Sequence, residues 1–240
     1  IDCIEDDLRG RPDTNLVILH RPIQLGPGSH NHAAAVSGRQ RPSVQFDGQA
    51  NSLISASDDH TIHRWQTARR LRDFATLSNI DKAVRVVHYR PRQNNLLAAG
   101  LENGEIQIWD FLSQRAPVSL ISDRADRVFD LQFSHDSDSL FSIHGSGQIL
   151  KWDTNDLTKI ATASAASEKR FDFAAQAMAL VGSEHHLLAI GGRFNRLVLW
   201  DFEKDTQQVL NYPGEVDPNH YLFDVTAAED RPMGALRCGT

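Results

Sequence analysis

Cysteine is scarce in this chain, which has only Cys3 and Cys238 among its 240 residues. Two cysteines are too few for a disulfide scaffold, and no neighbouring Cys or His gives them the ligand spacing of a zinc site. Their apolar neighbours Ile4 and Leu236 indicate ordinary strand positions. The absence of a cysteine framework favours a reducing compartment such as the cytoplasm.

Long apolar runs and an excess of positive charge are missing as well. The longest apolar pieces are short, such as 197–200, whereas a membrane span needs roughly 18 residues, so we expect a soluble chain without a span. With 25 Lys and Arg against 31 Asp and Glu, the net charge is −6, which argues against a nucleic-acid-binding surface over the whole molecule. The chain opens at Ile1 without the order of a signal peptide, and we expect the native start to be missing.

The sequence does contain a repeat built around its four tryptophans. Trp65, Trp109, Trp152 and Trp200 follow one another at intervals of 44, 43 and 48 residues. Each belongs to a similar segment, and these segments are 57–65, 101–110, 144–153 and 192–201. A weaker copy at 11–20 has Leu19 in the tryptophan position, 46 residues before Trp65. A fixed period of this length indicates a repeat architecture.

Two short apolar or alternating runs precede each tryptophan segment. Polar turns rich in Gly, Asn, Asp and Ser separate them, which is the pattern of strands in hairpins. Each unit therefore predicts four antiparallel strands: two upstream strands, the tryptophan strand, and a fourth such as 116–121 or 207–212. The upstream runs are 43–46 and 53–56, 84–88 and 96–99, 128–133 and 140–143, and 177–181 and 187–190.

These features resemble the WD40-repeat β-propeller family, whose units run about 40 to 45 residues with four strands to a blade. The resemblance covers essentially the whole chain and implies an all-β propeller of four-stranded antiparallel blades. The terminal Trp-Asp pair of the family stands at Trp109–Asp110, Trp152–Asp153 and Trp200–Asp201, while Trp65 is followed by Gln66.

The family also places an aspartate six residues before the tryptophan, where it can hydrogen-bond a histidine from the start of the blade. Asp59 occupies that position in one unit, and the other units have Asn103, Ser146 and Phe194 there. The resemblance therefore implies a complete Asp-His-Ser/Thr-Trp network only in the unit of Trp65.

We expect one propeller domain over 1–240, with whole blades at about 27–76, 77–121, 122–164 and 165–212 and partial blades at 1–26 and 213–240. Seven blades are the commonest form of the family and need about 315 residues at this spacing. The resemblance thus favours part of a larger propeller, tethered to other domains of a longer polypeptide. The alternative is a five-bladed ring closed by the terminal strands, which would leave no open gap in the ring.

The resemblance implies a scaffold for protein or peptide partners, without catalysis or a cofactor, and nucleic acid is not expected as a partner. In this fold the loops that enter the first strand and those between the second and third strands gather on one rim. Arginine and aromatic residues are enriched at binding hot spots. The candidate rim residues are Arg124, Arg127, Lys169, Arg170, Phe171, Arg193, Phe194, Asn195 and Tyr212. For Phe194, packing on a neighbouring blade is an equal alternative.

The competing hypothesis is a propeller enzyme or ligand-binding domain with its site in the central channel. The sequence has no local serine-hydrolase, P-loop or dinucleotide signature. Close histidine pairs would suit a metal only with further ligands, and no Glu or Cys recurs beside them. These pairs are His30 with His32, His60 with His63, and His185 with His186. We expect no metal and no catalytic residue.

Overall fold

The computed structural model describes residues 15–17, 34–36, 43–46, 51–66, 72–93, 95–113, 115–121, 126–155, 162–163, 167–181, 186–193, 196–210, 221–226 and 235–239. No helix in this part of the chain is long and apolar enough to cross a membrane. Every regular element among the described residues is a β-strand. The expected all-β class is therefore confirmed.

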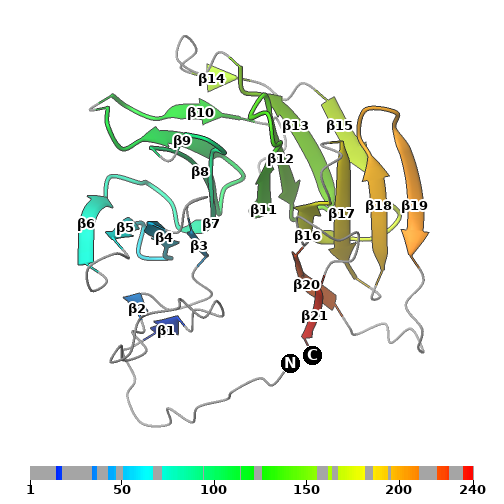
Figure 1. Ribbon diagram of the computed structural model, residues 1–240, viewed down its shortest axis with the longest axis horizontal. Coiled ribbons are helices and arrows are strands. Elements are labelled where there is room, and N and C mark those ends of the chain that lie inside the picture. The colour runs from blue at the N-terminus through cyan, green and yellow to red at the C-terminus, as the bar shows by residue number, and fades with distance from the viewer. Residues whose placement is uncertain are drawn as a thin grey trace.

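Four sheets of antiparallel strands follow one another around a common axis (Figure 1). Each begins with an innermost strand and ends with an outermost one, and we name each sheet by its first and last strand. They are the β3–β6 sheet (β3 Val44–Phe46, β4 Ser52–Ala56, β5 Ile62–Gln66, β6 Arg72–Leu77), the β7–β10 sheet (β7 Val84–Tyr89, β8 Leu96–Leu101, β9 Ile106–Asp110, β10 Val118–Leu120), the β11–β15 sheet (β11 Val128–Phe133, β12 Ser139–His144, β13 Gln148–Asp153, β15 Ser167–Arg170) and the β16–β19 sheet (β16 Ala175–Leu180, β17 Leu187–Gly192, β18 Leu197–Asp201, β19 Thr206–Leu210).

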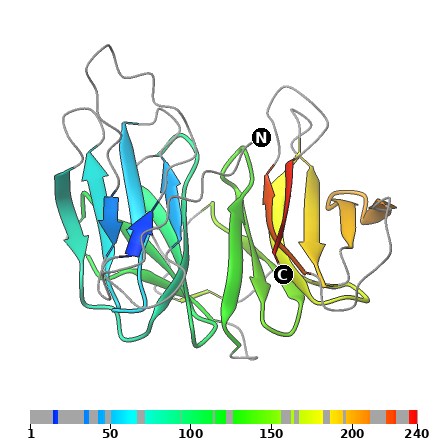
Figure 2. The same cartoon turned by 90° about the horizontal axis from the view of Figure 1, so that it is seen from below.

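Two hairpins and one short strand lie beside these sheets. The strands β1 (Asn15–Val17) and β2 (Ala34–Val36) pair antiparallel, as do β20 (Tyr221–Thr226) and β21 (Ala235–Gly239), which contains Cys238. The strand β20 packs against β16 and β17 (Figures 1 and 2). The strand β14 (Thr162–Ala163) pairs parallel with β10 and so adds a fifth strand to the β7–β10 sheet.

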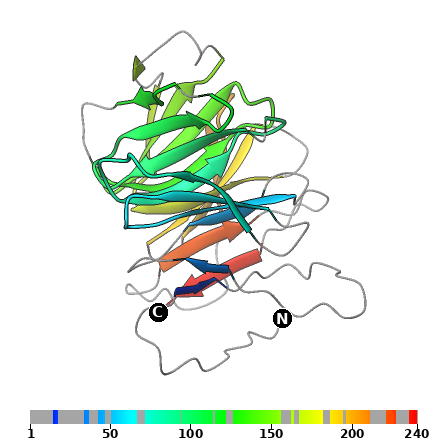
Figure 3. The same cartoon turned by 90° about the vertical axis from the view of Figure 1, so that its left-hand side faces the viewer.

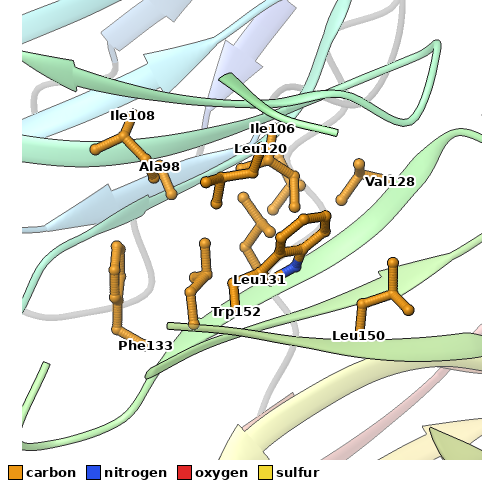
Figure 4. Packing of buried hydrophobic residues seen from close by; sticks show 11 residues of the cluster. Ala98, Ile106, Ile108, Leu120, Val128, Leu131, Phe133, Leu150 and Trp152 are labelled. Carbon is orange, nitrogen blue, oxygen red and sulfur yellow. The ribbon is translucent and has the colours of Figure 1, made fainter. Parts of the chain in front are cut away.

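The core lies between neighbouring sheets, which are stacked face to face around the axis (Figure 3). Both faces of the middle strands are apolar, because each sheet packs against a neighbour on either side. Figure 4 shows the cluster between the β7–β10 and β11–β15 sheets, where Leu120 and Leu131 surround the fully buried Trp152. A second cluster joins the β3–β6 and β7–β10 sheets, and a third, containing Phe141 and Trp200, joins the β11–β15 and β16–β19 sheets.

Side chains of one innermost strand hydrogen-bond the backbone of the next. The Gln45 side-chain oxygen accepts from the Tyr89 backbone N–H at 2.5 Å, and the Asp130 carboxylate accepts from the Met178 N–H at 2.7 Å. An innermost strand is the edge of its sheet and would otherwise leave these N–H groups without a ladder partner. The sheets are thus joined by polar contacts along the axis as well as by the apolar core between them.

The outermost strands differ most from the sequence-based expectation. The sequence predicts a blade that ends at 164 and a loop at 168–171, whereas the structure places 167–170 on β15, paired with β13. The strand reads Ser-Glu-Lys-Arg and has no apolar alternation, because it lies at the solvent-exposed edge of its sheet. The strand is defined by the pairing of its backbone with β13. Backbone pairing of this kind leaves no signature in the sequence.

Candidate partner-binding face

Three of the four innermost strands, and also β20, share an irregularity near their starts. The strands β7, β11, β16 and β20 each have a β-bulge, between Val84 and Val86 in β7 and at matching places in the other three. A bulge redirects the side chain of the extra residue, and the side chains redirected here include those of Arg85, Phe129 and Gln176. Because neighbouring strands are antiparallel, the turns at 57–61, 102–105 and 145–147 lie at this same end, as does Arg193, whose backbone N–H donates to the Ala174 carbonyl at 3.0 Å. We call this end, defined by the three bulged residues, the three turns and Arg193, the bulge face.

Arg85 joins two sheets at the bulge face. Its Nη1 lies 3.0 Å from an Asp58 carboxylate oxygen in the turn of the β3–β6 sheet, and its Nε lies 3.1 Å from a Glu102 carboxylate oxygen in its own sheet. Arg85 and Asp58 are each 24% exposed, so solvent screens these ion pairs only in part. The two carboxylates hold the guanidinium at the bulge face.

Arg127 and Phe129 form a second contact at this face. The guanidinium carbon of Arg127 lies 4.8 Å from the centre of the Phe129 ring. Arg127 is exposed, whereas Phe129 is half-buried and packs against the core cluster between the β11–β15 and β16–β19 sheets. A cation over an exposed ring contributes about 0.5–1 kcal/mol. The bulge face therefore carries an arginine and an aromatic ring in contact, and the ring is packed against the core.

The turn before β9 sits directly against the segment that enters β11. Gly104 has a φ of +85°, and a Cβ there would lie 2.3 Å from the backbone carbonyl oxygen of Asp126. A larger residue fits neither this backbone conformation nor this space. The close contact fixes the segment that carries Arg127 relative to the β7–β10 sheet.

The structure brings together only some of the residues predicted for the rim. Arg127 and Arg193 lie at the bulge face and are exposed. Phe171 also lies at this end, but it is half-buried, with its ring centre 5.6 Å from that of Phe173 and 6.0 Å from that of Trp200. Arg124, Phe194, Asn195 and Tyr212 lie outside the described residues.

The prediction that places Lys169 and Arg170 in a rim loop is wrong, because both lie on the outermost strand β15. The amine of Lys169 is 2.6 Å from an Asp205 carboxylate oxygen, and Arg170 Nε is 2.6 Å from a Glu168 carboxylate oxygen. Sequence reasoning also missed Arg85, Phe129 and Gln176. Aligning the four units would show these residues at one shared position, but nothing in the sequence marks that position as a bulge.

The aspartates of the repeat cap turns. Asp110, Asp153 and Asp201 each accept a hydrogen bond from the backbone N–H two residues on, at 2.9, 2.9 and 3.1 Å. This local bond closes the turn that follows each tryptophan strand. Asp59 acts in the same way before its strand, accepting from both the backbone N–H and the hydroxyl of Thr61.

The tryptophans differ in their hydrogen-bond partners. The indole N–H donates to a serine hydroxyl in two sheets, from Trp65 to Ser55 at 2.9 Å and from Trp152 to Ser142 at 2.8 Å. The position that corresponds to these serines holds Ala99 in the β7–β10 sheet and Ile190 in the β16–β19 sheet. There the indole N–H donates elsewhere, from Trp109 to Gln107 at 3.2 Å and from Trp200 to Asp205 at 3.0 Å.

The Trp152 contact extends into a chain of three buried side chains. The Ser142 hydroxyl is 2.9 Å from His144 Nε2, and His144 Nδ1 is 3.0 Å from the backbone carbonyl oxygen of Asp126. Burial lowers the pKa of His144 and favours its neutral form. The prediction confined such a network to the unit of Trp65. The structure shows a related network in the β11–β15 sheet, which runs from Trp152 through Ser142 and His144 to the backbone carbonyl of Asp126.

The strand register places Gln45, His88, Gln132 and Ala179 at equivalent positions of successive innermost strands. Burial lowers the pKa of His88 to about 4, although hydrogen bonds to the Tyr89 carbonyl and Gln132 oppose this shift.

Among the described residues, no three His, Cys, Asp or Glu side chains are grouped to hold a metal ion. Of the histidine pairs considered for a metal, only His60 with His63 lies wholly within the described residues: His60 Nδ1 is 3.2 Å from the Ile80 carbonyl oxygen and His63 Nδ1 is 3.2 Å from the Thr76 hydroxyl.

Comparison with known proteins supports the architecture. No family model matches the chain. A Drosophila melanogaster protein described as "GATOR2 complex protein Wdr59" is 22% identical over 204 residues, which cover 81% of this chain and 20% of that relative. A chain in a crystal structure of the mitotic checkpoint complex superposes with a TM-score of 0.64 at 14% identity, over 82% of this chain and 60% of that chain. The chain thus spans about a fifth of the length of the curated relative.

The sequence repeat, the sheet topology and these likenesses agree with one another. Four tryptophan segments fall on the third strands of four successive antiparallel sheets, which is the blade plan of a propeller. The relative described as Wdr59 and the solved structure each match about four fifths of the chain. Together these observations show that the chain has a β-propeller fold built of four-stranded antiparallel blades, like those of WD40-repeat proteins.

Proposed function

We propose that this propeller is a non-catalytic scaffold that binds a protein or peptide partner across its bulge face. The observation that carries the proposal is the recurrent bulge, which turns Arg85, Phe129 and Gln176 out of the regular ladder at one end of three sheets. Three sheets thereby contribute a side chain to one surface. A partner that contacts all three would be recognised by the arrangement of the sheets as well as by each residue.

The composition and rigidity of the face suit such a partner. Arginine and aromatic residues dominate binding hot spots, and Arg127 stacked on Phe129 supplies both at one point. The ion pairs of Arg85 with Asp58 and Glu102 already hold one arginine in position. A surface that is ordered before binding loses little conformational entropy when a partner arrives.

The named likenesses point in the same direction. The curated relative is described as a protein of the GATOR2 complex, and the solved structure is that of the mitotic checkpoint complex. Both names refer to multiprotein complexes, and they support a protein partner for this chain.

Charge reversal at Arg127 is expected to weaken capture of the partner at least tenfold, because it removes an exposed hot-spot cation from the bulge face. The matched control is Arg115→Glu, which reverses an exposed arginine between β9 and β10, at the opposite end of the sheets. Affinity capture of wild type and both variants, followed by quantitative mass spectrometry, measures the effect. Equal recovery of the same proteins with Arg127→Glu and wild type would contradict the proposal.

A further inference from the structure

Asp126 and Arg127, which we call the entry segment, lead into β11 and are held by a bond that two other bulged sheets lack. In three sheets, the backbone N–H after the second strand donates to the backbone carbonyl at the entry to the first strand. These bonds are Glu102 to Ala83 at 3.0 Å, Gly145 to Arg127 at 2.9 Å and Arg193 to Ala174 at 3.0 Å. The β11–β15 sheet adds a side-chain bond, in which His144 Nδ1 lies 3.0 Å from the Asp126 carbonyl oxygen. At the register position of His144 the other two sheets have Leu101 and Gly192, which have no side-chain donor.

The added bond belongs to the sheet that presents an exposed arginine at its entry. The other two sheets have alanine at the position of Arg127. The Asp126 carbonyl oxygen also lies against the turn of the β7–β10 sheet, where a Cβ added to Gly104 would meet it at 2.3 Å. His144 itself stands opposite Val128 in the ladder, directly before the bulge of β11. His144 is thus placed to fix both the entry segment and the start of the bulge.

The direction of each hydrogen bond around His144 follows from its partners. The Trp152 indole N–H can only donate, which it does to the Ser142 hydroxyl oxygen at 2.8 Å. The Asp126 carbonyl can only accept, so His144 Nδ1 must carry a hydrogen. In a neutral ring Nε2 is then an acceptor, and it receives the Ser142 hydroxyl hydrogen at 2.9 Å. Ser142 and His144 are buried, and this arrangement gives each of their polar groups a partner.

We infer that neutral His144 is a positioning residue for the bulge face, and that protonation of its ring releases the entry segment from the sheet. The bond from Nδ1 holds the Asp126 carbonyl and so keeps Arg127 in place, with its guanidinium carbon 4.8 Å from the centre of the Phe129 ring. The inference rests on the proposed function in one respect, namely that Arg127 contacts the partner. Release of the entry segment in acid would then weaken partner binding.

The neighbours of the ring explain why a proton is not accommodated in place. The ring bonds Ser142 and Asp126, the network continues to Trp152, and the backbone pairs with Val128. Of these four residues only Asp126 ionises. Burial lowers the pKa of His144, and the carbonyl and carboxylate of Asp126 oppose this shift without cancelling it. A hydrogen on Nε2 would also leave the buried Ser142 hydroxyl without its acceptor, which favours movement of a charged ring toward solvent.

The first test is nitrogen NMR of the histidine rings in the chain labelled with ¹⁵N. The His144 signals are those that His144→Asn removes from the spectrum. At pH 7.5 they are expected to show the hydrogen on Nδ1, as the hydrogen-bond directions require. A ring with its hydrogen on Nε2 would overturn the inference.

The second test is hydrogen exchange at pH 7.5 and 4.5, measured by mass spectrometry on peptides within 126–133 and corrected for the intrinsic rate at each pH. In wild type, protection of this segment is expected to fall about tenfold more than protection of β17 as the pH is lowered. His144→Asn keeps an N–H donor near the place of Nδ1 but does not titrate, so its relative protection is expected to be equal at both pH values. His144→Ala lacks the donor and is expected to show low protection at both.

His88→Gln is the matched control, because His88 also has a pKa lowered by burial but bonds Tyr89 and Gln132 instead of the entry segment. It is expected to behave like wild type in 126–133, and circular dichroism melts establish that each variant folds. Equal losses of protection in wild type and His144→Asn would overturn the inference, as would wild-type protection that does not change with pH. Neither test needs a partner, so both are decided separately from the binding role proposed above.

Discussion

Replacing Trp152 with alanine is expected to lower the free energy of unfolding by about 3–5 kcal/mol, the usual cost of truncating a large buried aromatic side chain. Trp152 is fully buried in the cluster between the β7–β10 and β11–β15 sheets (Figure 4). The substitution opens a cavity where two sheets meet. It also removes the indole N–H that donates to Ser142, which is itself fully buried. Urea unfolding followed by far-ultraviolet circular dichroism measures the loss.

Trp65→Ala is the matched control, because it removes an equivalent indole–serine hydrogen bond in another sheet. Trp65 is only half-buried, and its ring stacks on His63 at 5.5 Å. A half-buried side chain leaves a smaller cavity, so we expect about half the cost of Trp152→Ala. Similar losses for the two variants would mean that the hydrogen bond, and not burial between the sheets, sets the contribution of each tryptophan.

These unequal costs show that the repeat predicts where each tryptophan lies but not what surrounds it. The tryptophan spacing predicts the third strand of each blade, and Trp65, Trp109, Trp152 and Trp200 all lie on such strands. Their surroundings diverge because the serine that accepts from Trp152 is replaced by an apolar residue in two sheets. Alternating apolar positions specify where strands pack, but the polar partners inside each blade depend on single residues.

The candidate site was harder to predict than the strands for a physical reason. A bulge adds one residue to a ladder without changing its composition, so Phe129 gives no sign in the sequence that it leaves the regular alternation. The strand β15 was missed because charged residues at a solvent-exposed edge look like a loop. His144 was missed as a network member because its last partner is the backbone carbonyl of Asp126, and a backbone group has no residue-type signature.

The same structure has a consequence for acid stability, which we expect to fall as the pH drops below about 6.5. Burial lowers the pKa of His88 to about 4 in the folded chain, whereas an unfolded histidine has a pKa near 6.5. Between these two values the unfolded state binds a proton that the folded state excludes, so lowering the pH favours unfolding. The loss is confined to this interval and amounts to at most about 3 kcal/mol for this one group. The lowered pKa of His144 adds to it in the same direction.

The surroundings of His88 explain why it stays neutral. Its ring lies 5.9 Å from that of Phe133, and its Nδ1 is 2.9 Å from the Tyr89 carbonyl oxygen. The hydrogen bonds to the Tyr89 carbonyl and to Gln132 stabilise the charged ring less than burial destabilises it, so the balance favours the neutral form. His88→Gln keeps a polar side chain of similar reach that does not titrate in this range.

Urea midpoints at pH 7.5, 6.0, 5.0 and 4.0 for wild type and His88→Gln measure the contribution of this group. Wild type is expected to lose more stability than the variant between pH 6.5 and 4, and the two curves are expected to run parallel above pH 7. Parallel curves over the whole range would show that His88 does not govern the response to acid. A loss that wild type and His88→Gln share as the pH approaches 4 would instead point to carboxylates that both proteins keep, such as Asp201, whose pKa is lowered by hydrogen bonds from Lys204 and Glu203.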